Sequence, residues 1–171
     1  MLIRALGTIL TPGNGVDLVV LLQFPQLGPN PYVTNPVAQQ AAWAGQNASQ
    51  VIWNDLARQA VQFFPGHAMY LETDRLFAPG DRYFTWDRSP TGGWLRARKI
   101  DDLHVCPYGA ALFGSLVVND LTPVLDLPPM APGWELGSWV HEPNYNDPPG
   151  ACPADQPPPG YTGVEVPGPP S

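Results

Sequence analysis

The sequence predicts a mixed α/β domain organised around a parallel β-sheet. Two apolar runs, at residues 17–24 and 67–72, are separated by one long helical pattern. The first run is almost continuously apolar and rich in branched residues, which is typical of a parallel strand buried on both faces. Two parallel strands joined by a helix form a right-handed crossover. A chain of 171 residues is long enough to bury a core of this kind.

The elements at the N-terminus are short. Residues 2–10 are expected to form a helix that ends at the Pro12-Gly13 turn. Pro25 ends the first strand. The loop at residues 26–34 then leaves the carboxyl end of that strand, where open α/β sheets hold their ligands.

The long helix is expected to span residues 36–63. Asn35 is a typical N-cap residue, and Pro36 fits the first helical turn. Residues at helical spacing predict the face of this helix that packs in the core. This face comprises Trp43, Asn47, Val51, Ile52, Leu56, Ala60 and Phe63.

Residues 77–94 are predicted to form a long loop. A loop of this length in a compact domain is either functional or disordered. Its aromatic residues favour an ordered flap over a pocket. We therefore expect Tyr83, Trp86 and Trp94 to shape a substrate subsite for an acyl group or a sugar.

A candidate catalytic pair follows this loop. Asp101 stands three residues before His104, and Pro107 and Gly109 begin an apolar helix expected at residues 108–119. A carboxylate that accepts a hydrogen bond from Nδ1–H of an imidazole fixes the tautomer and leaves Nε2 free to take a proton from a nucleophile. The alternative is a histidine that merely occupies the entry to the helix.

The Asp-x-x-His block, with a proline three residues and a glycine five residues after the histidine, resembles the last conserved block of SGNH (GDSL-type) hydrolases. The resemblance implies a three-layer α/β/α sandwich with a flavodoxin-like parallel sheet. It also implies a serine esterase in which Asp101 and His104 complete a triad with a serine. The tail at residues 139–153 is similar to tails of exported actinobacterial, especially mycobacterial, members.

Two blocks of that family are absent from the sequence. The chain contains neither the Gly-Asp-Ser block that carries the nucleophile nor the Gly-x-Asn-Asp block. A doubly wound sheet usually has about five strands, and the sequence shows two convincing ones. The chain is therefore expected to be the C-terminal part of such a hydrolase, with a domain incomplete at its N-terminus.

Three functional hypotheses follow. In the first, His104 and Asp101 serve an esterase, lipase or carbohydrate O-acyl esterase, whose substrate is an acylated lipid or glycan. In the second, the chain is a non-catalytic envelope protein that uses a hydrolase scaffold for binding. In the third, it is half of a split enzyme, and a partner chain supplies the nucleophile. The isolated chain is expected to be nearly inert.

The composition limits the classes of binding partner and the cellular compartments that are expected for this chain. A net charge of −7 and a pI near 4.6 argue against nucleic-acid binding. The low charged fraction of 13%, with many Trp and Pro residues, favours an extracellular or cell-envelope protein whose export signal lies upstream of this chain. No transmembrane segment is expected. No cofactor is expected, and no metal either, because no Cys or His pair has ligand spacing.

Cys106 and Cys152 form either two free thiols or a disulfide that holds the tail beside the helix. The bridge is favoured because a tail without a core of its own needs an anchor. In an oxidising compartment such a bridge contributes roughly 3–4 kcal/mol.

The chain divides into three predicted regions. Residues 1–121 form the α/β domain. Residues 122–153 wrap its surface. Residues 154–171 are rich in proline and are expected to be extended or disordered.

Overall fold

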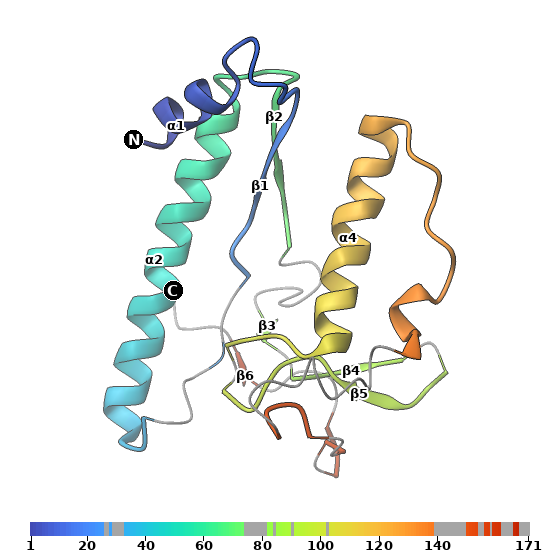
Figure 1. Cartoon of the computed structure of the whole chain (residues 1–171). Helices are drawn as coiled ribbons and strands as arrows, with labels where there is room; N and C mark the ends of the chain where they lie inside the picture. The colour runs from blue at the N-terminus through green and yellow to red at the C-terminus, as the bar shows by residue number, and fades with distance from the viewer. Residues whose placement is uncertain are drawn as a thin grey trace.

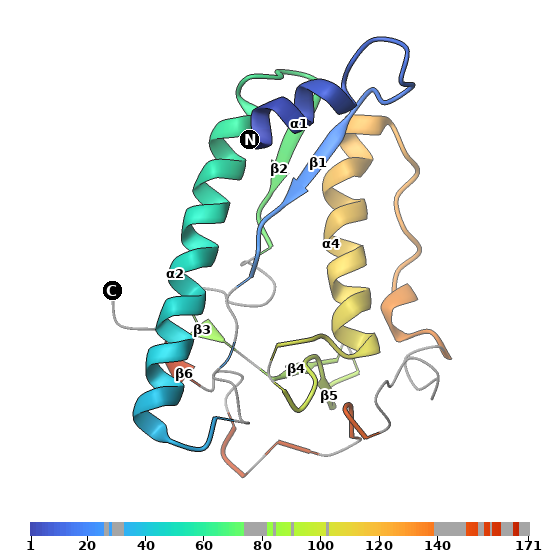
Figure 2. The ribbon, with the colours of Figure 1, turned by 60° about the vertical axis from the view of Figure 1, so that its left-hand side comes forward.

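The computed structural model describes most of the chain, referred to as the described part. That part comprises residues 1–25, 28, 33–73, 82–83, 85–89, 91–101, 103–138, 150–153, 156–157, 159–161 and 166–167. Two long helices, α2 (Pro36–Val61) and α4 (Pro107–Leu125), flank a small parallel sheet (Figures 1 and 2). This arrangement confirms the predicted mixed α/β class.

The parallel sheet consists of β1 (Val19–Leu22) and β2 (Ala68–Leu71), with Val19 opposite Ala68 and Leu22 opposite Leu71. The two strands are connected through α2, so the predicted strand–helix–strand order is confirmed. We call residues 19–71 the crossover unit. The carboxyl ends of both strands face the region that holds the short antiparallel strands and the start of α4 (Figure 1).

Buried polar side chains hold the carboxyl ends of these strands. Asn54 of α2 accepts a hydrogen bond from the Phe24 N–H at 2.9 Å and donates one to the Phe24 carbonyl at 3.0 Å. The Thr73 N–H donates to Oε1 of Gln23 at 2.8 Å, and the Thr73 hydroxyl donates to the Gln23 carbonyl at 2.9 Å. These bonds satisfy backbone groups where the strand ladder ends.

The sheet is smaller than the family resemblance implies. Within the described residues it has two strands, and all four residues of β1 are half-buried. A strand with this composition was expected to be buried on both faces, but a two-stranded sheet lacks the neighbouring strands that cover a central strand. The three-layer sandwich is therefore not confirmed.

The helices begin where the sequence predicts. α1 (Leu2–Ile9) buries Leu6, and the side chain of Asn35 caps α2 by accepting from the Ala38 N–H at 3.0 Å. Pro107 is the first residue of α4. These agreements reflect local signals, since an N-cap side chain and a proline in the first turn act within a few residues.

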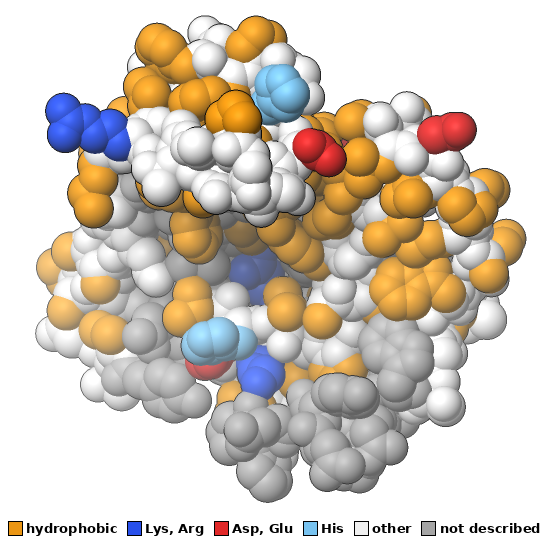
Figure 3. Space-filling view, turned by 45° about the horizontal axis from the view of Figure 1, so that its top comes forward, with side chains coloured by type: hydrophobic (Ala, Val, Ile, Leu, Met, Phe, Trp, Pro, Cys, Tyr) orange, Lys and Arg blue, Asp and Glu red, His pale blue; other side chains and the backbone are white. Residues whose placement is uncertain are grey.

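The predicted packing face of α2 is wrong in part. Trp43, Asn47 and Ala60 are buried, as expected. The bulky apolar residues of the expected face are instead exposed by half or more of their area: Val51, Ile52, Leu56 and Phe63. Their places are taken by Asn54 and Ala57, which are small enough to bring α2 close to the strands, and Asn54 supplies the hydrogen bonds to Phe24. On the face shown in Figure 3, hydrophobic side chains are likewise exposed around a central hollow.

The region predicted as one long loop contains short strands. β4 (Trp86–Arg88) pairs with β5 (Trp94–Arg96), and β3 (Arg82–Tyr83) pairs with β6 (Val166–Pro167), both in the antiparallel sense. The loop prediction is corrected accordingly. Residues 74–81, 84 and 90 lie outside the described part. The tight turn at Gly92, which has φ of 91°, allows β4 and β5 to form a hairpin.

α4 is longer than predicted. It continues past residue 119 and past the expected domain boundary at 121 to Leu125. Its length of 19 residues and mean hydropathy of 1.2 meet the minimum for a helix that crosses a membrane, and core helices pass the same test. The expected absence of a transmembrane segment therefore stays a prediction.

The tail returns along α4. A 3₁₀-helix, η1 (Trp134–Leu136), packs on α4 where Gly114 leaves room for the Trp134 ring, since a Cβ at Gly114 would lie 3.2 Å from it. Residues 139–149 lie outside the described part, as does most of the segment after residue 153. Within that last segment, Tyr161 contacts β4 and β6 pairs with β3.

Candidate active site

The candidate pair lies in a tight hairpin between β5 and α4. Arg98 and Val105 form an antiparallel bridge, and the Lys99 N–H donates to the His104 carbonyl at 2.8 Å. The chain between them turns back within a few residues. We call residues 97–106 the dyad hairpin. Asp102 lies outside the described residues.

Within this hairpin the side chains of Asp101 and His104 meet. Nδ1 of His104 lies 2.7 Å from Oδ2 of Asp101. The other carboxylate oxygen, Oδ1, accepts hydrogen bonds from the Leu103 N–H and the His104 N–H, each at 3.0 Å. The two-residue gap in Asp-x-x-His is thus explained: one oxygen closes the turn while the other holds the imidazole.

The electrostatics favour an ionised aspartate. Burial by itself would raise the pKa of Asp101. Hydrogen bonds from the His104 side chain and from the backbone of His104 and Leu103, together with the charge of His104, outweigh burial and bring the pKa below its ordinary value. A carboxylate that stays ionised keeps accepting from Nδ1–H.

The imidazole is oriented and accessible. The side chain of His104 is 65% exposed, whereas that of Asp101 is 23% exposed. With Nδ1 engaged by the carboxylate, Nε2 is the nitrogen available for proton transfer. In the described part of the chain, no hydroxyl is hydrogen-bonded to His104; Ser49 bonds to the Gly45 carbonyl and Ser89 to Thr91. The described residues therefore provide a base and its orienting acid, and none of their hydroxyls is hydrogen-bonded to that base.

Close backbone packing fixes the hairpin on α4. The Ala97 carbonyl accepts from the Cys106 N–H at 2.8 Å and lies directly against Gly109. A Cβ at residue 109 would overlap with that carbonyl, because the carbonyl carbon alone would be 2.9 Å away. The missing side chain at Gly109 therefore lets the start of α4 lie close to the backbone of the hairpin.

A disulfide anchors the tail to the hairpin. Cys106 and Cys152 are bonded, with their Cα atoms 5.7 Å apart, which confirms the predicted bridge. Next to it, the Ile100 N–H donates to the Ala151 carbonyl at 2.9 Å, and Ala151 is buried. A disulfide is consistent with an extracellular location, since such bonds persist in oxidising compartments.

The predicted substrate aromatics form a cluster with the tail. The Tyr161 ring lies edge-on to Trp86 and Trp94, with centroid distances of 5.4 and 5.0 Å. Arg96 stacks over Trp86, which is 9% exposed, and Arg88 stacks over Trp94. Both tryptophans thus have packing partners within the chain. Their role in substrate binding stays a prediction, and the Tyr83 side chain lies outside the described part.

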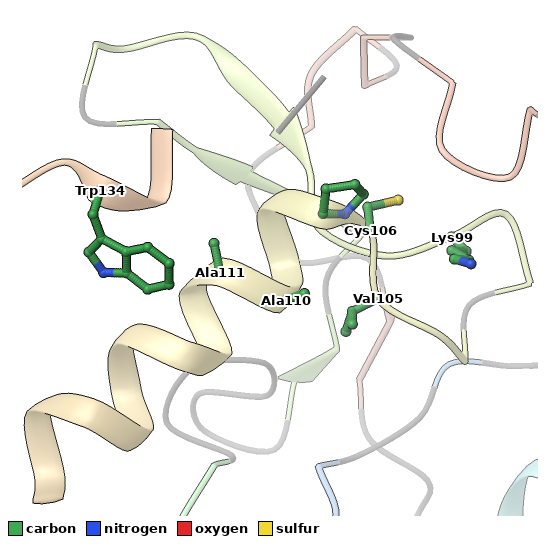
Figure 4. A pocket seen from close by; sticks show the side chains of 7 residues that line it. Lys99, Val105, Cys106, Ala110, Ala111 and Trp134 are labelled. Atoms are coloured by element: carbon green, nitrogen blue, oxygen red, sulfur yellow. The ribbon is translucent and has the colours of Figure 1, made fainter. Parts of the chain in front are cut away.

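A cavity of about 340 Å³ opens beside the start of α4 (Figure 4). In this view Trp134 lies at one end of the lining and Lys99 at the other, with Ala110, Ala111 and Cys106 between them. Among the described residues, the lining comprises Lys99, Val105, Cys106, Pro107, Ala110, Ala111 and Trp134. Sequence reasoning did not find this cavity, because its walls come from three segments without a shared motif.

A half-buried acid near the site was also missed. Asp87 lies on β4, and burial raises the pKa of its carboxyl despite hydrogen bonds from the Arg88 backbone and the Tyr108 side chain. Tyr108 belongs to the first turn of α4 and is 3% exposed. The contact therefore ties the β4–β5 hairpin to the helix that follows His104. A single acid between Trp86 and Arg88 gives no signal of this in the sequence.

No group of three or more His, Cys, Asp or Glu side chains that could hold a metal ion is found in the part of the chain that the structure describes. Comparison with known protein families, with curated proteins and with solved structures finds no match to this chain.

Proposed function

We propose that this chain supplies the histidine and the aspartate of a Ser-His-Asp triad in an SGNH-type ester hydrolase acting on acyl esters of lipids or glycans. The observation that carries the proposal is the 2.7 Å contact between Nδ1 of His104 and Oδ2 of Asp101. The same carboxylate is fixed by two backbone N–H groups, and the imidazole is exposed on its other side.

The proposed chemistry assigns one task to each side chain. A serine hydroxyl attacks the ester carbonyl, and its proton passes to Nε2 of His104. The tetrahedral intermediate then expels the alcohol, which takes that proton. A water molecule then attacks the acyl-enzyme by the same two steps, and the carboxylic acid is released. Asp101 stays ionised throughout and stabilises the imidazolium that forms in each step.

The nucleophile is proposed to lie on a segment other than the described residues. The crossover unit supports such a partner, because β1 is half-buried although it consists of Val and Leu. A segment that adds strands to this sheet would cover it and would bring the sheet to the size of a three-layer sandwich. Ligands in such sheets bind at the carboxyl ends of the strands, which is the end that faces the short strands and the start of α4 (Figure 1).

The test combines this chain with a Gly-Asp-Ser-bearing polypeptide, which is first sought in the reading frames adjacent to that of this chain; absence of such a polypeptide counts against the proposal. Hydrolysis of p-nitrophenyl butyrate is measured for the wild type and for His104→Ala, which should lose on the order of 10³-fold or more in turnover. His67→Ala is the matched control, because His67 is exposed and bonds the Asp17 carbonyl in the crossover unit. Equal rates for wild type and His104→Ala would overturn the proposal.

A non-catalytic binding protein is the second candidate. It is favoured by one observation, namely that no described hydroxyl is bonded to His104. A fluorophosphonate probe separates the two functions. Labelling of a serine in the assembled complex, dependent on His104, supports catalysis. Absence of labelling, together with specific binding of an acylated glycan or lipid, supports the binding protein.

A further inference from the structure

We infer that the cavity beside the dyad hairpin binds the acyl chain of the ester, and that this chain is a linear alkyl group of medium length. The identity of the ester rests on the proposed function. The existence of an alkyl-binding site does not, since it depends on the shape and the walls of the cavity.

The position of the cavity fits this role. Val105, which lines it, directly follows His104, and Lys99, which also lines it, donates its backbone N–H to the His104 carbonyl. The cavity therefore lies next to the backbone of His104, although His104 is not among its described lining residues. An acyl chain whose carbonyl carbon stands near a catalytic imidazole must extend into a space that begins there.

The walls select an apolar ligand. Four of the lining residues are aliphatic, namely Val105, Pro107, Ala110 and Ala111, and Trp134 contributes an aromatic ring. Lys99 is the one charged residue among the described residues of the lining. None of the seven lining residues carries a hydroxyl, an amide or a carboxylate side chain, so the hydroxyls of a sugar would lose water without gaining partners. An alkyl chain loses nothing of this kind and gains contact with the walls.

The size of the cavity limits the chain. Small-molecule sites enclose roughly 300–1,000 Å³, so a cavity of about 340 Å³ is at the small end of this range. It equals about eleven water volumes at about 30 Å³ each, which is room for an alkyl chain of medium length. Trp134 lies at the end away from Lys99 (Figure 4), where it is packed on α4 beside Gly114. A longer chain would have to leave the cavity.

The experiment measures binding of sodium alkanoates from butanoate to dodecanoate to the intact chain by calorimetry, with 1-octanol as an uncharged probe. Affinity should rise roughly fourfold with each added methylene up to about octanoate and then stop rising, because burial of a methylene contributes a constant increment. 1-Octanol should bind as well, since the walls recognise the alkyl part.

Ala110→Leu fills the cavity from an exposed position on α4, and it should weaken octanoate binding by at least about tenfold. Ala48→Leu, at an exposed position of α2, is the matched control and should bind like the wild type. If Ala110→Leu fails to fold, Val105→Phe fills the same cavity from the hairpin.

Three results would overturn the inference: no binding of octanoate to the wild type, affinity independent of chain length, or unchanged binding in the filled variant. These results do not depend on a serine. Failure of alkyl binding with intact His104-dependent hydrolysis rejects the acyl pocket alone, whereas alkyl binding without such hydrolysis rejects the proposed enzyme alone.

Discussion

The crossover unit and the dyad hairpin are stabilised in opposite ways. The crossover unit is rich in apolar residues and leaves many of them in solvent, with Ile52 61% exposed and Leu56 53% exposed. The dyad hairpin also leaves Ile100 and Leu103 in solvent, yet the neighbouring Ala97 and Arg98 are 0% and 1% exposed. Backbone hydrogen bonds, a glycine contact and a disulfide hold it in place.

This difference shows that apolar patterns and spacings of polar residues predict different aspects of the structure. An apolar pattern indicates that a surface of the helix or strand is favourably buried. It does not indicate whether the described residues are the ones that bury it. A spacing of polar and small residues predicts the local backbone and side-chain geometry, because the interacting groups lie within a few residues of each other.

Loss of the disulfide should have the largest effect. Cys152→Ser opens a link between residues 46 positions apart, and the chain-entropy estimate for such a loop is about 4 kcal/mol of unfolding free energy. Urea denaturation of oxidised wild type and variant measures the difference. Reduction of the wild type with dithiothreitol is the control and should reproduce most of the loss.

The same variant tests whether the regions are independent. Hydrogen exchange of the Ile100 amide, which donates to Ala151, should accelerate, while amides of β1 such as Leu21 should change less. Equal acceleration of exchange at Ile100 and at Leu21 would show that the crossover unit and the dyad hairpin unfold as one unit. The two regions would then not be stabilised independently.

Gly109→Ala should have the next largest effect. The added Cβ overlaps with the Ala97 backbone, which cannot move without breaking its bond to the Cys106 N–H. Overpacking of this kind costs about 3 kcal/mol. Gly45→Ala is the matched control, since it lies in α2 with no atom within 4 Å of the new Cβ. This control should gain roughly 0.5–1 kcal/mol by helix propensity. A neutral Gly109→Ala would contradict the close packing of the hairpin on α4.

The dyad hairpin shows which features of the site could be predicted from the sequence. The Asp101–His104 contact, the start of α4 and the Cys106–Cys152 bridge were all predictable, because spacing, a proline and a pair of cysteines constrain short stretches or leave few alternatives. The tight contact between Gly109 and Ala97 agrees with the same motif. Neither the cavity nor the Asp87–Tyr108 contact was predictable, since each joins segments that share no local pattern.

The errors lie where distant segments had to be placed. The exposed face of α2 was predicted as core because bulky apolar residues usually are, but Asn54 binds both backbone groups of Phe24 and so turns its own face inward. One of the short strands in the region predicted as a loop, β3, depends on the distant strand β6. Such pairings are decided by tertiary contacts that override local propensity.

Asn54→Ala should therefore destabilise the crossover unit. The substitution leaves the N–H and the carbonyl of Phe24 without their partners in a part-buried position, at a cost of about 2 kcal/mol. Gln59→Ala, at an exposed position of the same helix, should change the unfolding free energy by less than about 0.5 kcal/mol. Equal urea midpoints for the two variants would show that Asn54 does not orient α2, and the explanation of its exposed apolar face would fail.

The smallest expected effect is the dependence of stability on acid pH at Asp101. Burial alone would raise the pKa of this carboxyl, but the hydrogen bonds from His104 and Leu103 lower it below the ordinary 3.8. A lower pKa in the folded state means that the unfolded chain binds the proton more tightly. The contribution to stability is thus complete above pH 3.8 and is lost as the pH falls through 3.8 toward the folded value.

Asp101→Asn isolates this contribution. The asparagine oxygen still accepts from the backbone N–H groups, but its amide does not titrate and cannot accept from Nδ1–H of His104. The stability advantage of the wild type over the variant should shrink between pH 6 and pH 3 by less than about 1 kcal/mol, because a partly exposed pair is screened by solvent. Asp55→Asn, which removes the carboxylate of the ion pair with Arg58 in the crossover unit, controls for the loss of one charge. An advantage that stays constant or grows on acidification would mean that His104 and the backbone do not stabilise the ionised carboxylate, and the dyad would then lack the fixed acid that proton transfer at Nε2 requires.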